Sequence, residues 1–244
     1  MADPFEIISQ NLTEVRQRIT DAASRSGRDP KDVRLIAVTK YVPAEIARLL
    51  AGAGAGAGAG ATELAESRPQ ELWSKAELLQ DAGVTWHLVG HLQRNKVRRT
   101  VQVASWIHSV DSEKLLQAIA EEATTAGRFV EVLLEVNVSG DQAKHGFRPE
   151  DLASALSRIP SSTAVAIRGF MTMARRQGGQ EVARRDFAKL RQLRDELAVD
   201  AAEHISLDEL SMGMSGDYEQ AIAEGATMVR VGRALYKGLE PPRS

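Results

Sequence analysis

The residue of this sequence best suited to covalent chemistry is Lys40. It directly follows the short apolar segment 35–39. An amine at the end of a buried strand is partly shielded from water, and this makes it available as a nucleophile that forms a Schiff base with a carbonyl group. The alternative is a lysine whose charged end reaches solvent at the rim of the fold. Lys40 alone does not separate these two interpretations.

A second group of candidate residues lies near the C-terminus. Ser211 begins the segment Ser-Met-Gly-Met-Ser, which ends at Ser215 and alternates small residues with methionine. Arg230, Gly232 and Arg233 close a later apolar segment. Small residues and backbone amides at the start of a helix allow a phosphate group to approach closely. We therefore expect a phosphate cradle in this region, with an arginine beside it.

The elements that position these residues follow from apolar patterning. Residues 1–26 carry an apolar stripe with helical spacing, and eight strand-like segments then alternate with helical ones. The predicted strands are 35–39, 61–64, 85–89, 105–110, 130–138, 165–173, 205–211 and 228–231, and the predicted helices between them are 43–51, 69–81, 94–103, 112–126, 149–158, 180–199 and 216–224. The alternating Ala-Gly tract 51–61 is expected to be a loop, because each glycine costs about 1 kcal/mol inside a helix.

This alternation over 244 residues predicts a single-domain (β/α)8 TIM barrel, residues 1–244, with an additional N-terminal helix. The alternative arrangement is an open doubly wound sheet. In a barrel, the residues that close the strands share one face, and the loops after the last two strands commonly hold phosphate. A Schiff-base lysine, a phosphate cradle and an arginine on that face together indicate a site for pyridoxal 5′-phosphate (PLP).

Six blocks of sequence resemble the YggS/PROSC family of PLP-binding homeostasis proteins, which share a barrel with the N-terminal domain of alanine racemase. The blocks are AVTK (37–40), ESRPQEL (66–72), WHLVGHLQRNK (86–96), NVS (137–139) with KHGF (144–147), RGFM (168–171), and LSMGMS (210–215) with MVRVG (228–232). They occur in order and span nearly the whole chain, so the resemblance is more specific than any single motif.

The resemblance implies that PLP is bound covalently to Lys40 as an internal aldimine. It also implies that Ser211 and the backbone amides of Gly232 and Arg233 hold the phosphate, and that Arg230 faces the pyridine nitrogen. A guanidinium does not accept a proton, so it leaves that nitrogen unprotonated and weakens the ring as an electron sink. Where the family usually has Gly-Glu-Asn after the second strand, this sequence has Ala65-Glu66-Ser67, so Ser67 is expected near the cofactor through a shorter side chain.

Composition limits the other functions. Lys and Arg number 31 against 33 Asp and Glu, a net charge of −2, which lacks the positive field that nucleic-acid binding needs. Absence of cysteine excludes disulfides and thiolate metal sites. The start lacks a signal-peptide pattern, and no apolar run approaches about 20 residues, so we expect a cytoplasmic protein that does not bind membranes. His87 and His91 flank the end of a strand, where their spacing does not put them on one face, so no metal ligand is assigned.

The resulting hypothesis is a monomeric PLP-binding protein of intracellular PLP homeostasis, which buffers the cofactor or delivers it to PLP-dependent apoenzymes. No catalytic residue is assigned, because racemisation needs a second acid–base group opposite Lys40 and none is evident. The alternatives are a PLP-dependent amino-acid racemase and a cofactor-free, aldolase-like barrel in which Lys40 attacks a sugar phosphate.

Overall fold

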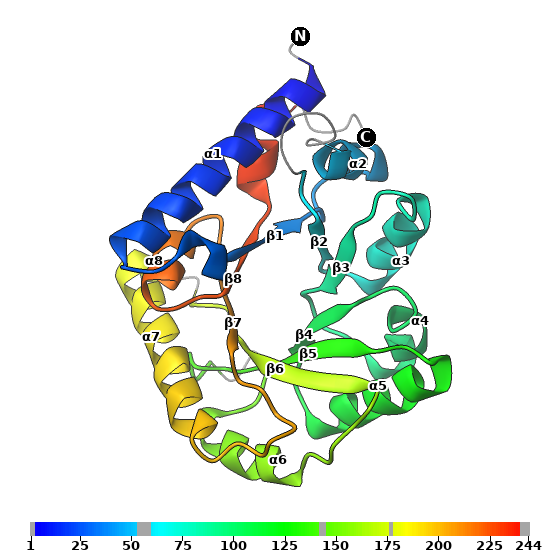
Figure 1. Cartoon of the computed structure of the whole chain (residues 1–244), viewed down its shortest axis with the longest axis vertical. Helices are drawn as coiled ribbons and strands as arrows, with labels where there is room; N and C mark the ends of the chain where they lie inside the picture. Colours follow the sequence, from blue (N-terminus) through cyan, green and yellow to red (C-terminus); the bar gives the residue numbers. More distant parts are fainter. Residues whose placement is uncertain (1–2, 53–59, 142–144, 176–177, 240–244) are drawn as a thin grey trace.

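The computed structural model describes residues 3–52, 60–141, 145–175 and 178–239. The chain forms a closed barrel of eight parallel strands in sequence order (Figure 1). The strands are β1 (Arg34–Val38), β2 (Glu63–Glu66), β3 (Thr85–Leu88), β4 (Trp106–Val110), β5 (Val130–Glu135), β6 (Val165–Met171), β7 (Glu209–Met214) and β8 (Met228–Val231). Because β1 pairs with both β2 and β8, the predicted (β/α)8 barrel is confirmed and the open sheet is wrong.

Helices surround the strands (Figure 1). They are α1 (Pro4–Arg25), α2 (Ala44–Gly52), α3 (Pro69–Leu78), α4 (Val97–Thr100), α5 (Glu113–Ala126), α6 (Leu152–Arg158), α7 (Gly179–Ala198) and α8 (Tyr218–Ala223). Short 3-10 helices are η1 (Pro30–Asp32), η2 (Arg94–Lys96), η3 (Pro149–Asp151) and η4 (Arg233–Tyr236). No helix in these described ranges combines the length and the apolar character needed to cross a membrane.

The N-terminal helix α1 begins where its sequence predicts. The Asp3 carboxylate accepts a hydrogen bond from the amide of Phe5, and Pro4 occupies the first turn, both of which favour helix initiation. Its apolar stripe is buried from Ile8 to Ala23. The helix packs against α2, α8 and η4. In the described residues after β8 the helical segment is η4, and α1 packs over it on the outside of the barrel.

The barrel interior contains both apolar and polar side chains. One buried cluster consists of Ile36, Val38, Ala65, Trp106, Leu133, Met171 and Met228. At the amino ends of the strands, the Arg34 guanidinium lies 4.8 Å from the Trp106 ring centroid and pairs with Glu63 and Glu209. These contacts occupy the amino end of the barrel, whereas the sites of such barrels lie at the carboxyl ends of the strands.

Several predicted boundaries are wrong for identifiable reasons. β7 spans 209–214 rather than 205–211, because Ile205 and Leu207 are buried core residues that belong to the preceding loop. β2 likewise begins two residues later than predicted, since Ala61 is buried without joining the strand. The predicted helix 94–103 is two short pieces, η2 and α4. Most of the Ala-Gly tract, residues 53–59, lies outside the described residues.

Candidate functional site

Lys40 lies in the turn that follows β1. The strand ends at Val38, and Thr39 takes the last buried position, which leaves Lys40 exposed with its Nζ 5.1 Å from the centroid of the Tyr41 ring. The prediction that Lys40 closes β1 at the barrel rim is confirmed in position. Of the two interpretations left open for its amine, this structure fits the one in which Lys40 reaches solvent at the rim, because the turn carries the side chain beyond the buried strand.

A buried ion pair holds this turn in place. The Lys75 Nζ on α3 donates hydrogen bonds to the carbonyls of Thr39 and Val42, each at 2.8 Å, and to the Glu66 carboxylate at 2.5 Å. The Thr39 hydroxyl donates to the same carboxylate oxygen at 2.7 Å. An ammonium group has three donors, and here all three are used. Lys75 therefore fixes the backbone on both sides of Lys40.

Sequence reasoning missed Lys75 and Glu66 as functional residues. Their signal was available, because Lys75 occupies the buried face of α3 together with Leu72 and Ala76. A lysine at such a position is rarely buried unless it is paired. Glu66 closes β2 with no exposed surface, which makes it the matching partner.

Gly232 brings the end of β8 against the Lys40 turn. The register Ala37↔Val231 places Gly232 beside Val38. A Cβ atom at Gly232 would lie 3.0 Å from the Tyr41 ring and 3.2 Å from the Val38 carbonyl oxygen, so this close approach requires glycine. The amide of Gly232 donates to the Ser215 hydroxyl at 3.3 Å. The next residue, Arg233, is exposed and begins η4, where an amide has no partner within its own helix.

Ser211 does not share this position. Its buried hydroxyl lies 2.6 Å from the Arg230 guanidinium and 2.9 Å from the His108 Nδ1. The hydroxyl beside Gly232 belongs to Ser215, a residue that the sequence analysis left without a role. The two serines are four residues apart around Gly213, whose φ of +89° turns the end of β7 and separates their directions.

Arg230 lies inside the barrel and is held from two sides. Besides its bond to Ser211, it donates to the carbonyl of Thr172 at 2.9 Å. Burial lowers the pKa of Arg230 to about 10, an effect that the carboxylates of Asp217 and Glu135 oppose. The guanidinium thus stays protonated at neutral pH, so the barrel interior contains a fixed positive charge.

Two neutral histidines continue this network. The His108 Nε2 lies 3.0 Å from the His87 Nδ1. Burial lowers the pKa of His87 to about 3 and also lowers the pKa of His108. Because Arg230 donates to Ser211, the serine hydrogen is available for the His108 Nδ1, and the His108 Nε2–H is then directed at His87. This series of hydrogen bonds fixes the orientation of Arg230.

Ser67 follows β2 and is half-buried. Its hydroxyl makes no hydrogen bond within the described ranges. Its backbone lies very close to Gly90, where an added Cβ would meet the Ser67 carbonyl oxygen at 2.1 Å. Ser67 therefore belongs to the same carboxyl-terminal end of the barrel as Lys40, with a hydroxyl free to contact a ligand.

Comparisons with known proteins agree with this architecture. Residues 10–240 match the family model for the alanine racemase N-terminal domain. The chain is 37% identical over 229 residues to the pyridoxal phosphate homeostasis protein of Pseudomonas aeruginosa, covering 94% of each chain, and 32% identical over 235 residues to that of Escherichia coli K12, covering 94% of this chain and 95% of the relative.

Solved structures give the same result. The structure of PipY from Synechococcus elongatus with PLP bound has a TM-score of 0.81 and 36% identity, and the match covers 94% of this chain and 99% of PipY. An alanine racemase from Clostridium difficile, with 16% identity and a TM-score of 0.67, is matched over 95% of this chain and 56% of its own length, and shares the fold alone. The chain belongs to the pyridoxal phosphate homeostasis protein family, with the barrel of the alanine racemase N-terminal domain.

Proposed function

We propose that this protein binds PLP at the carboxyl end of its barrel and acts in PLP homeostasis as a carrier. The observation that carries the proposal is the packing of the Lys40 turn against Gly232, beside the Ser215 hydroxyl, on neighbouring strands that also hold the buried Arg230. An aldehyde requires an amine, a phosphate requires hydroxyl and amide donors, and a facing cation suits an unprotonated ring nitrogen. The PLP-bound relative PipY supports this assignment.

The phosphate end is assigned to the Gly232 region. The Ser215 hydroxyl and the backbone amides of Gly232 and Arg233 would hold it, with Ser215 taking the role first expected of Ser211. Oxygen and amide donors of this kind suit a dianion. Ser67, on the neighbouring β2 end, would add a hydroxyl contact.

The aldehyde end is assigned to Lys40, which would attach the cofactor covalently through Nζ. When bound, the cofactor supplies a reactive aldehyde and an electron-withdrawing ring. Lys75 and Glu66 fix the turn from beneath, so that the amine is presented from a rigid backbone. The exposure of Lys40 favours exchange with an incoming amine or recipient protein, which a carrier requires.

Arg230 disfavours catalysis at this site. With a pKa of about 10, it remains a donor at neutral pH and leaves a facing ring nitrogen unprotonated, which limits the ring as an electron sink. Racemisation also needs an acid on the face opposite Lys40. Burial raises the pKa of Tyr218 and of Tyr236, and both hydroxyls are enclosed in the described part of the chain, so neither suits that role.

The remaining parts of the proposal are a cytoplasmic location, a monomeric state and PLP-dependent apoenzymes as recipients. A transfer experiment tests the carrier role. Protein loaded with PLP is mixed with a PLP-dependent apoenzyme, and the return of that enzyme's activity is compared with the return produced by free PLP and by Lys40→Ala protein treated in the same way. We expect transfer from the loaded protein and none from the variant.

The racemase alternative is tested in deuterated water with L-alanine. We expect no α-deuterium incorporation at ordinary enzyme rates, about 1–1000 per second. Rapid incorporation with loss of optical rotation would establish the racemase and refute the carrier. A purified protein without a visible absorption band, even after incubation with PLP, would instead favour the aldolase-like alternative.

A further inference from the structure

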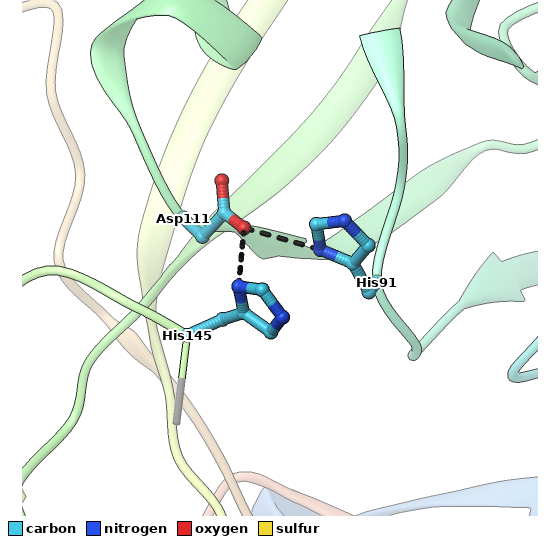
Figure 2. A group of neighbouring side chains, drawn as sticks. All are labelled: His91, Asp111 and His145. Carbon is cyan, nitrogen blue, oxygen red and sulfur yellow. Dashed lines mark ion pairs between the residues drawn. The ribbon is translucent and has the colours of Figure 1, made fainter. Parts of the chain in front are cut away.

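A second group of side chains lies at the carboxyl ends of β3, β4 and β5, separate from the residues assigned to PLP. His91 follows β3, Asp111 follows β4, and His145 lies in the connection after β5. Figure 2 shows the two imidazole rings turned toward one carboxylate oxygen of Asp111. Three consecutive strands of the barrel thus deliver nitrogen and oxygen ligands to one point.

The distances within this group are close to those of ligands around one small cation. The His91 Nδ1 lies 3.2 Å and the His145 Nδ1 3.8 Å from the Asp111 Oδ2, and one ligand atom of each residue lies within 4.8 Å of the others. With metal–ligand bonds of about 2.0–2.1 Å, neighbouring ligands around a tetrahedral zinc ion are about 3.3 Å apart. The His145 distance is longer than this, but its side chain is 63% exposed and therefore has room to move toward the other two ligands.

The surroundings hold these groups in place. The imidazole rings of His91 and His145 stack, with centroids 4.3 Å apart and planes 18° from parallel. The second Asp111 oxygen accepts a hydrogen bond from the Ser112 hydroxyl at 3.1 Å, and Ser112 is also the N-cap of α5. Such an outer contact orients a ligating carboxylate. Asp111 is 13% exposed, whereas His91 and His145 are 43% and 63% exposed, so an ion has access from solvent.

We propose that His91, Asp111 and His145 bind a divalent transition-metal ion of the Zn²⁺ class. Imidazole and carboxylate ligands suit this class, and three protein ligands leave a fourth position open to water or to a ligand. The site lies on the same barrel face as Lys40, because all eight strands are parallel. It is independent of the PLP assignment, since it uses none of those residues.

This proposal revises the expectation that the sequence contains no metal ligand. His87 does not contribute to this site, since it is directed into the barrel and bonded to His108. The partners of His91 come instead from positions 20 and 54 residues later in the chain, and the pairing of β3 with β4 and of β4 with β5 brings them together.

The test measures ZnCl2 binding to the untagged full-length protein by calorimetry at pH 7.5, with and without bound PLP. The variants are His91→Ala, His145→Ala and Asp111→Asn, and the matched control is His204→Ala, whose ring contacts the Ile159 carbonyl far along the sequence. We expect one Zn²⁺ per chain for wild type and control. Each site variant should bind Zn²⁺ at least about tenfold more weakly. Loss of a residue that only orients a metal ligand already weakens binding about 10–100-fold, and loss of the ligand itself should weaken it more.

Ring proton NMR provides a second readout, as the chain has only five histidines. Zn²⁺ should shift the signals of His91 and His145 and leave those of His204 unchanged. Saturation only above about 1 mM, a Kd equivalent to about −4 kcal/mol, or unchanged affinity in His91→Ala would overturn the proposal. A His91 signal that responds to pH but not to Zn²⁺ would show an ion pair only and would also refute it.

Discussion

The Lys75→Met substitution is expected to weaken the fold and the Lys40 turn together. Lys75 is 5% exposed at its side chain, and its Nζ satisfies two backbone carbonyls and the fully buried Glu66 carboxylate. Methionine fills a similar volume but has no charge and no donor. The substitution therefore removes the donor of two carbonyls and the counter-charge of a buried carboxylate, which keeps only its hydrogen bond from the Thr39 hydroxyl.

The expected loss in the free energy of unfolding follows from these contacts. Removing one partner of a buried ion pair costs about 3–5 kcal/mol, because the other charge remains buried and uncompensated. Against a total stability of about 5–15 kcal/mol, this is a large loss. Replacing both partners, as Lys75→Met with Glu66→Gln, removes both charges and should cost less than the sum of the two single substitutions.

Urea unfolding followed by circular dichroism measures these free energies, with Lys114→Met on the exposed face of α5 as the control lysine. The visible absorption of PLP added to each folded variant gives a second readout, which should fall for Lys75→Met because the backbone on both sides of Lys40 loses its support. A loss of less than about 1 kcal/mol for Lys75→Met, within the range of an exposed salt bridge, would refute this account of the turn.

Three further predictions concern the site and the barrel interior. Ser215→Ala should weaken PLP binding by about tenfold to a hundredfold, since a charge-assisted hydrogen bond contributes about 1.5–3 kcal/mol. A PLP titration monitored by visible absorption measures this affinity. A larger effect from Ser211→Ala would show that Ser211, and not Ser215, contacts the phosphate. Acidification should destabilise the protein, because the pKa of His87 is about 3 in the folded state and about 6.5 in the unfolded state. The contribution of His87 to stability is fully present above about pH 6.5. It is lost as the pH falls toward about 3, at up to about 1.4 kcal/mol per pH unit. Urea unfolding at pH 7.5 and 5.5 should show a smaller loss for His87→Gln, and an equal loss would assign the effect to other groups. Gly213→Ala should lower the thermal midpoint, because φ is +89° and its Cβ would lie 2.6 Å from that of Ala221; an unchanged midpoint would mean that the end of β7 rearranges freely.

The barrel and its order were predictable because each buried strand is a short apolar run bounded by turn residues. Runs of this kind mark burial and not strand formation itself. Ile205 and Leu207 are buried in a loop, so they moved the predicted start of β7 toward the N-terminus. Helix ends were uncertain for the same reason, since apolar spacing continues where backbone hydrogen bonding stops.

The chain positions of the candidate site residues were also predictable, whereas their contacts were not. Lys40, Arg230 and Gly232 close their strands, and strand ends meet on one face. The direction of a side chain depends on local backbone geometry, and the turn at Gly213 decides that Ser215 rather than Ser211 lies beside Gly232. The partners of Lys75 likewise depend on how α3 docks on the barrel.

Borohydride reduction of the PLP-loaded protein, followed by peptide mapping, tests the central claim most directly. The reduction makes a covalent attachment permanent and marks the lysine that carries it. We predict loss of the visible absorption band and one phosphopyridoxyl group, located on Lys40, with no label at this position and no band in Lys40→Ala. A label on another lysine with Lys40 unmodified, or a band that persists in Lys40→Ala, would contradict the assignment of this site.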